Sequence, residues 1–292
     1  MSTIRMTRIR VFAAALAATF TLAACGSSGS SSDTTVPAVT HRIVSLSPTA
    51  TEMLYAIGAG DQVVAVDSLS TYPTEVADKV TKMSAYEPSV EAIVGYTPDV
   101  VVISNDMNKI TEQLESISSQ KITVWTGAAA ATLDDVYKQI TELGALTGHD
   151  KEAADLVSSM QSRIAKAVPA TPSTGSYFYE LDNTLYSVTS NTFIGALLKP
   201  FGLTNVADGA EAGNDYPQLN AEAIVKANPS IIFLADTKCC AANAAEVAKR
   251  PGWAGIDAVK NNRIVELDDD VASRWGPRVV DLVEQFAAAT NK

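Results

Sequence analysis

Continuous apolar runs alternate with amphipathic stretches along most of the chain. Runs such as 100–103 and 231–234 contain only Val, Ile, Leu or Phe, which is typical of buried strands. This alternation predicts an α/β fold in which helices cover both faces of mostly parallel sheets. The expected strands are 43–46, 63–66, 100–103, 122–125, 177–181, 231–234 and 264–267, and the expected helices include 50–57, 109–118, 192–198 and 277–289.

One helix–strand unit occurs twice, at 89–103 and at 220–234. Each copy contains an N-cap Ser or Asn, a short helix with Glu in its first turn, a Pro that ends the helix, and an apolar strand. The repetition predicts a duplicated protein with two lobes. Because Glu91 and Glu222 hold equivalent positions, a pseudo-twofold fold would present one exposed carboxylate on each lobe. Such a pair is spaced to meet a partner that is itself twofold.

Two helices are expected between the lobes, at 133–143 and 151–168, separated by Gly144 and Gly148. The second has one apolar stripe at helical spacing. We therefore expect an N-terminal lobe over 41–132, a helical connector over 133–170, a C-terminal lobe over 171–292, and a ligand cleft between the lobes. A helix that crosses between lobes is stiffer than extended strands, so large hinge closure is not expected.

The first residues are similar to a bacterial lipoprotein signal. Three arginines precede the apolar run 11–22, which is too short for a comfortable membrane span and is followed by Ala23, Ala24 and Cys25. In such a signal, residues 1–24 are removed and the sulfur of Cys25 receives diacylglycerol. The alternative is an ordinary secretory signal with a chance cysteine. Residues 25–40 would then be a lipidated Cys and a Gly/Ser-rich tether, holding the protein at the outer face of the cytoplasmic membrane.

The charge and the residue inventory exclude several classes of function. The net charge of −11 argues against nucleic acid as a partner and favours a partner with basic contact residues. His41 and His149 are the only histidines and lie outside the expected cleft, so no metal site is predicted. The sequence contains no nucleophile elbow and no phosphate-binding loop. We therefore expect a protein that is not an enzyme and needs no cofactor.

Cys239 and Cys240 are adjacent. An exported protein meets an oxidising environment, so a disulfide between them is expected, although its eight-membered ring is strained. The alternative is a pair of free thiols in a loop. A metal pair is less favoured because no third Cys or His lies nearby.

Four features together resemble the helical-backbone class of ABC-transporter substrate-binding proteins. They are the start Arg-Ile-Val-Ser-Leu-Ser-Pro-Thr-Ala-Thr-Glu at 42–52, the repeated Glu-Ala-Ile-Val unit, the interlobe helix, and Arg-Trp-Gly-Pro-Arg at 274–278. The resemblance covers 41–290 and is greatest to the cobalamin-binding branch. It implies capture of cobalamin or a related corrinoid, with a ferric siderophore or haem as alternatives. A sensory binding module without transport is a further alternative.

The resemblance also implies the partners. In this class the repeated glutamates dock onto arginines of the two membrane subunits, which implies that role for Glu91 and Glu222. The implied partners are a permease homodimer or pseudodimer with its cytoplasmic ATPase, and a small-molecule ligand. The binding protein itself is expected to be a monomer. The alternative for each glutamate alone is a first-turn carboxylate favoured by the helix dipole.

The ligand site is expected where the carboxyl ends of the strands face each other across the cleft. Tyr86 and Tyr216 stand where the cobalamin-binding family has tryptophans against the corrin, whereas Leu69 and Ser104 replace aromatics of that family. The candidates are Ser47, Leu69, Tyr72, Tyr86, Ser104, Asn105 and Trp125 from the first lobe, and Glu180, Tyr216, Asp236, Asp269, Arg274 and Trp275 from the second.

Other polar residues receive a structural interpretation. Thr49 and Glu52 have the spacing of a capping box, so Glu52 is expected to serve the helix start. The acidic run 268–270 is interpreted as a solvated turn. Arg274 and Arg278 are surface cations or, if they lie near the cleft, partners of an anionic ligand such as a ferric siderophore.

Overall fold

The protein is described by a computed structural model, which covers residues 40–117 and 121–291. The expected signal peptide, the lipidation site Cys25 and most of the tether lie outside these residues. None of the described helices is long and apolar enough to cross a membrane.

The N-terminal lobe contains a four-stranded parallel sheet in the order β2-β1-β3-β4. Because all four strands run in the same direction, their carboxyl ends share one edge. The predicted strands are confirmed, with β4 beginning one residue later than expected. The strands are β1 (Ile43–Leu46), β2 (Val63–Val66), β3 (Val100–Ile103) and β4 (Thr123–Thr126).

The C-terminal lobe repeats this plan in the order β6-β5-β7-β8, again with parallel pairing throughout. The repetition of strand order confirms the duplicated two-lobed α/β fold. The edge strand β6 was not predicted, because it is two residues long and carries no apolar run. The strands are β5 (Ser176–Glu180), β6 (Thr204–Asn205), β7 (Ile231–Leu234) and β8 (Ile264–Glu266).

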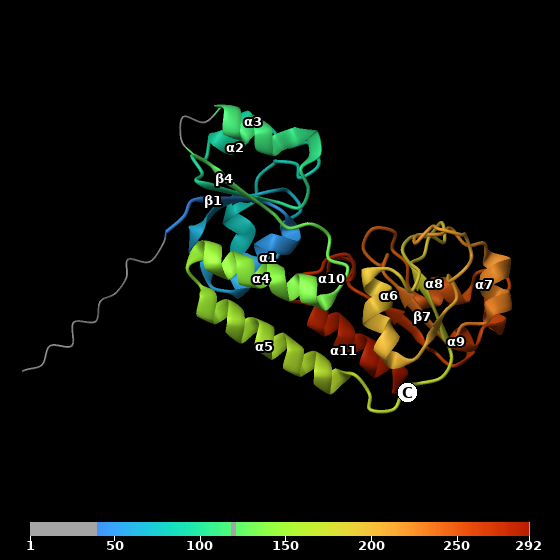
Figure 1. Ribbon diagram of the computed structural model, residues 1–292. Helices are drawn as coiled ribbons and strands as arrows, with labels where there is room; N and C mark the ends of the chain where they lie inside the picture. The colour runs from blue at the N-terminus through green and yellow to red at the C-terminus, as the bar shows by residue number, and fades with distance from the viewer. Residues whose placement is uncertain (1–39, 118–120, 292) are drawn as a thin grey trace, which may run out of the picture. The chain divides into compact units, whose positions relative to one another are not determined.

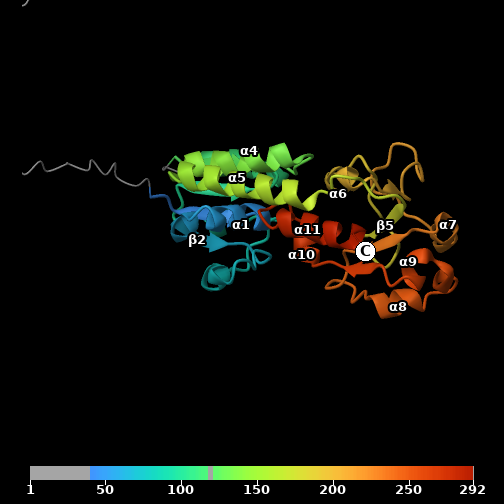
Figure 2. The same ribbon diagram turned by 90° about the horizontal axis from the view of Figure 1, so that it is seen from below.

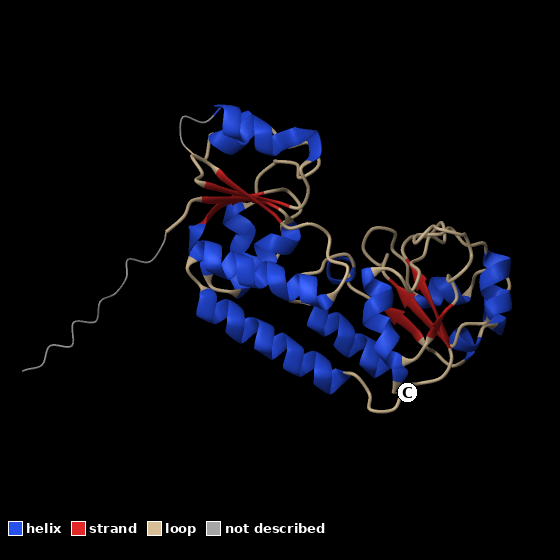
Figure 3. Ribbon diagram, viewed as in Figure 1, coloured by secondary structure: helices blue, strands red, loops and turns tan. Residues whose placement is uncertain are grey.

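Helices cover both faces of each sheet (Figures 1 and 3). In the N-terminal lobe, α2 and α3 lie on one face and α1 and α4 on the other. In the C-terminal lobe, α6 and α11 pack on one face and α7, α8 and α9 on the other. The lobe helices are α1 (Pro48–Ala56), α2 (Val90–Val94), α3 (Ile110–Ile117), α6 (Phe193–Leu198), α7 (Ala221–Ala227), α8 (Ala244–Ala248), α9 (Asp257–Lys260), α10 (Asp269–Ala272) and α11 (Val279–Thr290); short 3₁₀ turns are η1 (Ala59–Gln62), η2 (Thr74–Lys79), η3 (Met107–Lys109), η4 (Lys199–Phe201) and η5 (Trp253–Gly255).

The two repeat helices begin as the sequence predicts. The Ser89 side chain accepts a hydrogen bond from Ala92 N at 3.3 Å at the start of α2. The Asn220 side chain accepts one from Ala223 N at 2.8 Å at the start of α7. These bonds satisfy backbone N–H groups that a helix start leaves unpaired. Both copies of the unit therefore fold alike.

Two corrections concern helix ends. Helix α1 is capped by Ser47, with Pro48 in its first turn, so the predicted capping box of Thr49 and Glu52 is wrong. The connector helix α4 (Leu133–Thr147) continues through Gly144, which was expected to end it. A Cβ at Gly144 would lie 2.5 Å from the Cβ of Ala153, so this glycine permits close helix packing instead.

The connector helices α4 and α5 (Asp150–Ala167) pack against each other, and α5 packs against α11 (Figures 1 and 2). Arg163 of α5 forms ion pairs with Asp281 at 2.8 Å and with Glu284 at 2.7 Å, both on α11. The last helix of the chain is thus fastened to the connector.

One apolar core extends through both lobes. It contains Met53 and Ile140 of the N-terminal half together with Tyr179, Phe233 and Phe286 of the C-terminal half. Separate smaller clusters fill the other face of each sheet. Moving one lobe against the other would expose part of the shared core to water, which agrees with the expectation of limited hinge closure.

Candidate functional site

A cavity of about 250 Å³ lies between the two lobes, near the carboxyl ends of the strands. The segment between β4 and α4 forms one wall, through Ala129 and Ala130. The other walls come from the segment after β5, the start of α6, and residues 272–275. Among the described residues that line this cavity, Arg274 is the only charged one. The remaining lining is Leu181, Val188, Thr192, Phe193, Ile194, Tyr216, Ala272, Ser273 and Trp275.

Three predicted ligand residues meet at this cavity, namely Tyr216, Arg274 and Trp275. Tyr216 is 56 % exposed and offers its ring to a ligand. The indole of Trp275 is held by a hydrogen bond from Nε1 to Gln139 Oε1 at 3.1 Å. Phe193 was not predicted, because its place at the start of α6 shows no signal beyond the helix pattern.

Other exposed apolar side chains lie on loops at the carboxyl ends of strands. Leu69, Tyr72 and Tyr86 are 46 %, 44 % and 61 % exposed. Met107 and Tyr186, which carry no signal in the sequence that marks them as ligand residues, are 46 % and 40 % exposed.

Two predicted residues, Ser104 and Asn105, follow β3 and are half-buried. The Asn105 amide donates to Ser104 Oγ at 3.2 Å and accepts from Met107 N at 3.1 Å. These bonds fix the loop that carries Met107. Neither side chain lines the interlobe cavity.

Trp125 does not line the interlobe cavity. Its Nε1 donates to Glu142 Oε2 of α4 at 3.2 Å, and the ring lies over Gly127, where a Cβ would come within 2.5 Å of the indole. The expectation that Trp125 lines the cleft is therefore not met. Its side chain packs on the connector because β4 is an edge strand covered by α4.

Four other candidates contact groups of the protein itself or are buried, so their expected place on the cleft surface is wrong. Ser47 is buried and caps α1. Asp269 accepts hydrogen bonds from Lys238 N and Cys239 N at 3.0 and 2.8 Å. Glu180 and Asp236 are fully buried. Their polar atoms face the protein interior because the loops after β5 and β7 fold over the strand ends.

Glu180 and Asp236 form a buried acidic pair with one cation. Arg250 makes two hydrogen bonds of 2.6 Å to the two carboxylate oxygens of Glu180. Neither carboxylate oxygen of Asp236 has a hydrogen-bond partner in the described part of the chain. Burial, followed by the negative charge of Glu180, raises the pKa of Asp236 to about 7.

A second ionic cluster joins the lobes around Glu52, which is 3 % exposed. Its carboxylate accepts from Arg274 Nη1 at 3.0 Å and from Arg278 Nε at 2.9 Å and Nη2 at 2.5 Å. Arg274 Nη2 also donates to Asp270 at 2.9 Å and to Leu69 O at 3.0 Å. The two arginines are therefore neither surface cations nor free partners for an anionic ligand.

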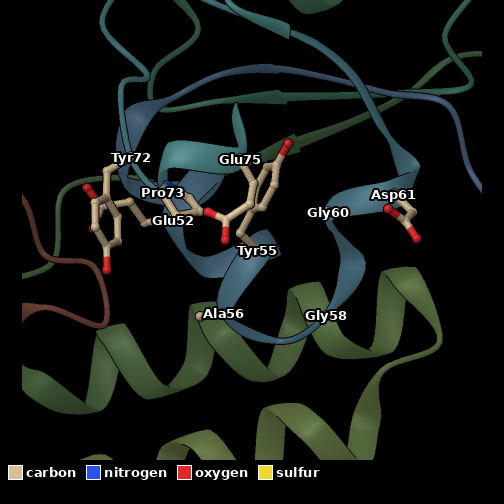
Figure 4. A pocket seen from close by; sticks show the side chains of 9 residues that line it. All are labelled: Glu52, Tyr55, Ala56, Gly58, Gly60, Asp61, Tyr72, Pro73 and Glu75. Atoms are coloured by element: carbon tan, nitrogen blue, oxygen red, sulfur yellow. The ribbon is translucent and has the colours of Figure 1, made fainter. Parts of the chain in front are cut away.

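Glu52 also borders a larger hollow of about 440 Å³ on the side of α1. In Figure 4, Glu52 and Tyr72 lie at one end of it, Tyr55 and Glu75 near its middle, and Asp61 at the other end. The guanidinium of Arg278 stacks 4.1 Å from the centre of the Tyr72 ring. We place the candidate ligand site in the interlobe cavity, because ligands of open parallel sheets bind at the carboxyl ends of the strands.

The acidic run 268–270 is an anchor rather than a solvated turn. Besides the contacts of Asp269, the ammonium of Lys238 pairs with Asp268 at 2.7 Å and with Asp270 at 2.8 Å. These contacts fasten the loop after β7 to the segment before Arg274. The local sequence alone does not reveal them, because Lys238 is distant in the chain.

Cys239 and Cys240 are free thiols, with their sulfur atoms 2.6 Å apart. The expected disulfide is therefore absent from this structure. Ring closure between adjacent residues would strain the backbone of a loop that the bonds to Asp269 and Asp236 O already hold. The contact with Cys240 raises the pKa of the Cys239 thiol. A thiol that stays protonated at neutral pH is a poor nucleophile.

Glu91 and Glu222 are exposed in the first turns of α2 and α7. Within the described residues, neither carboxylate forms an ion pair or a hydrogen bond. Both are thus free to meet another protein. The histidines serve the fold: His41 contacts Asp99 and His149 contacts Thr147. Within 40–117 and 121–291, no cluster of three or more His, Cys, Asp or Glu residues could hold a metal ion.

Comparison with known proteins gives consistent matches. A model of the family described as periplasmic binding protein matches residues 43–271. An ABC transporter substrate-binding lipoprotein of Bacillus subtilis is 35 % identical over 267 residues, which cover 88 % of this chain and 82 % of that protein. A cobalamin-binding protein of Halobacterium salinarum is 31 % identical, with 85 % of this chain and 69 % of the relative covered.

The fold also recurs in proteins with other ligands. The periplasmic haem-binding protein of Vibrio cholerae superposes with a TM-score of 0.73 at 21 % identity, covering 85 % of this chain and 97 % of that one. The fold is therefore shared by binding proteins for different macrocycles. The choice among ligands has to come from the side chains of the cleft.

Proposed function

The chain belongs to the periplasmic binding protein family, and we propose that its ligand is a corrinoid, either cobalamin or a close relative. The protein is a substrate-binding protein of the ABC-importer class rather than an enzyme. It therefore binds a small-molecule ligand outside the cytoplasm and works with a permease and its ATPase. Two relatives, which are 31 % and 30 % identical to this chain, are named as cobalamin- or B12-binding proteins.

The observation that carries the proposal is the absence of a free cation among the described residues of the cleft. Arg274 is the only charged residue there, and both of its terminal nitrogens are bonded to groups of the protein. Haem and many ferric siderophores carry carboxylates or other anionic groups that need unpaired Arg or Lys partners. The rim of a corrin ring carries uncharged amides, which suit aromatic faces and hydroxyl groups.

The size of the cavity indicates how such a ligand would lie. About 250 Å³ is below the roughly 300–1,000 Å³ of pockets that enclose a drug-sized molecule. A corrin would therefore rest across the mouth of the cavity, with its flat ring against exposed aromatic side chains. We propose Tyr216 on one lobe and Tyr86 on the other as the stacking partners.

Isothermal titration calorimetry tests this proposal. Cyanocobalamin and dicyanocobinamide should bind the native protein, and a ferric siderophore should not. Replacing Tyr86 or Tyr216 by Ala should weaken corrinoid binding by roughly 1–3 kcal/mol without unfolding the protein. Ile117→Ala, an equally exposed apolar residue at the far end of α3, is the control and should bind normally. Tight binding of the siderophore and none of either corrinoid would overturn the proposal.

We further propose that Glu91 and Glu222 dock onto basic residues of a permease homodimer or pseudodimer, with the binding protein as a monomer. Their free, exposed carboxylates on equivalent helices support this role. Replacing both by Lys should abolish uptake and leave ligand affinity unchanged. The matched control reverses Glu115 and Glu152, two exposed glutamates outside the repeat helices. Uptake that survives in the first variant, or fails in both, would count against docking.

The membrane attachment is also a proposal. We propose that residues 1–24 are removed and that Cys25 is lipidated at the outer face of the cytoplasmic membrane. We also propose that the folded part consists of an N-terminal lobe (41–132), a helical connector (133–170) and a C-terminal lobe (171–292). A multiply acylated cysteine anchors firmly. The native protein should partition into detergent, and Cys25→Ser should be released into the medium. A Cys25→Ser protein that stays membrane-bound would show a different anchor.

A further inference from the structure

Glu52 is a buried acid whose partners come from the opposite end of the chain. It lies on α1, 222 residues before Arg274 and 226 before Arg278. Gly276, between the two arginines, leaves room for the carboxylate, since a Cβ there would lie 3.2 Å from Glu52 Oε2. The segment after α10 is therefore shaped around this one side chain.

The two arginines have different surroundings beyond Glu52. Arg274 lines the ligand cavity and is 12 % exposed. Arg278 is 17 % exposed and stacks on Tyr72, away from that cavity. Since Glu52 is bonded to both, it governs how much positive charge the cleft presents to a ligand.

Groups of the protein already neutralise the positive charge of Arg274 and accept hydrogen bonds from it. Glu52 accepts from Nη1, and Asp270 and Leu69 O accept from Nη2. A carboxylate on a ligand would have to compete with these partners for the same donors. Without Glu52, one guanidinium nitrogen at the cavity wall would lose its acceptor, and the cluster would gain one uncompensated positive charge.

We infer that Glu52 is a positioning residue that makes the cleft select against anionic ligands, by neutralising Arg274 and occupying one of its guanidinium donors. This inference rests on the proposed function, because it concerns the same cleft. It adds that the preference for a ligand with an uncharged rim is set by a residue outside the interlobe cavity.

Matched ligands test the inference directly. Haemin and haemin dimethyl ester share a flat ring and differ in their two carboxylates. Glu52→Gln should bind haemin roughly tenfold more tightly than the native protein does, since the guanidinium of Arg274 loses a neutralising carboxylate and attracts the carboxylates of haemin more strongly. Affinity for the dimethyl ester should stay unchanged. Glu75→Gln, an exposed acid on the hollow beside α1, is the control and should leave both affinities unchanged.

Two further variants separate charge from folding. Removing one partner of a buried ion pair destabilises a fold, so folding is checked by circular dichroism. Asp270→Asn, at a more exposed position, also removes a countercharge of Arg274 and should raise haemin affinity in the same direction. Glu52→Gln combined with Arg278→Gln restores the charge balance and should return haemin affinity toward the native value.

The outcomes are distinct. Unchanged haemin affinity in folded Glu52→Gln, or in Asp270→Asn if the former does not fold, would overturn the inference. Equal gains in affinity for haemin and for its dimethyl ester would also overturn the inference, because they would reflect a loosened cleft rather than an effect of charge. Failure of the native protein to bind dicyanocobinamide would count against the corrinoid proposal alone, because the comparison of haemin with its ester does not depend on corrinoid binding.

Discussion

The two lobes each contain a buried glutamate held by arginine, but only the cluster around Glu52 is balanced in charge. Glu52 has two arginine partners, one of which is shared with Asp270. Glu180 has the single partner Arg250 and lies beside Asp236, a second buried acid whose oxygens have no partner in the described residues.

The two clusters differ in how well their buried charges are neutralised. A buried charge is tolerated when its partners neutralise it and satisfy its hydrogen bonds. The Glu52 cluster meets this condition and spans the interface between the lobes. The acidic pair within the C-terminal lobe meets it only when Asp236 is protonated. The second cluster should therefore depend more strongly than the first on its single arginine and on pH.

The largest expected effect is the loss of Arg250. Arg250→Met would leave two buried acids without a cation and should lower the free energy of unfolding by about 3–5 kcal/mol. Urea denaturation monitored by circular dichroism measures this. A loss below about 1 kcal/mol would show that the acidic pair does not depend on Arg250.

The next effect depends on pH. The raised pKa of Asp236, about 7, means that the folded protein keeps a proton that the unfolded chain has lost. This contribution to stability is fully present below about pH 4 and is lost as the pH rises to about 7. Asp236→Asn should therefore be more stable than the native protein by roughly 2–4 kcal/mol at pH 8, with the gain vanishing near pH 4. A pH-independent difference in urea midpoint would contradict this account.

A smaller effect is expected in the cluster with two arginines. Arg278→Met should cost about 1–3 kcal/mol, because Glu52 keeps the bond from Arg274. The same urea experiment compares it with Arg250→Met. If Arg278→Met proved the more damaging change, the redundancy inferred for the Glu52 cluster would be wrong.

The smallest effect sets the baseline. Lys249 and Glu246 form an exposed pair at 2.8 Å, one residue from Arg250. Lys249→Met should change the free energy of unfolding by less than about 0.5 kcal/mol, because exposed pairs are screened by water and salt. A loss comparable to that of Arg250→Met would mean that the assay reports a local helix defect rather than a buried charge.

The local pattern of the sequence determined much of the fold. Continuous apolar runs predicted the strands of both sheets except β6, whose two residues carry no such pattern. The repeated unit predicted the duplication and the exposed positions of Glu91 and Glu222. These features depend on neighbouring residues and on periodicity, so they can be read from the chain before it is folded.

Only the tertiary structure decided how the polar residues are used. The spacing of Thr49 and Glu52 matched a capping box, yet Glu52 turns inward to arginines more than two hundred residues away. Glu180 and Asp236 follow strands as cleft residues do, yet the loops above them bury both. Burial and ion pairing depend on which segments meet in space. A carboxylate has the same local sequence signal whether it caps a helix, binds a ligand or neutralises a distant arginine, so long-range packing alone decides its role.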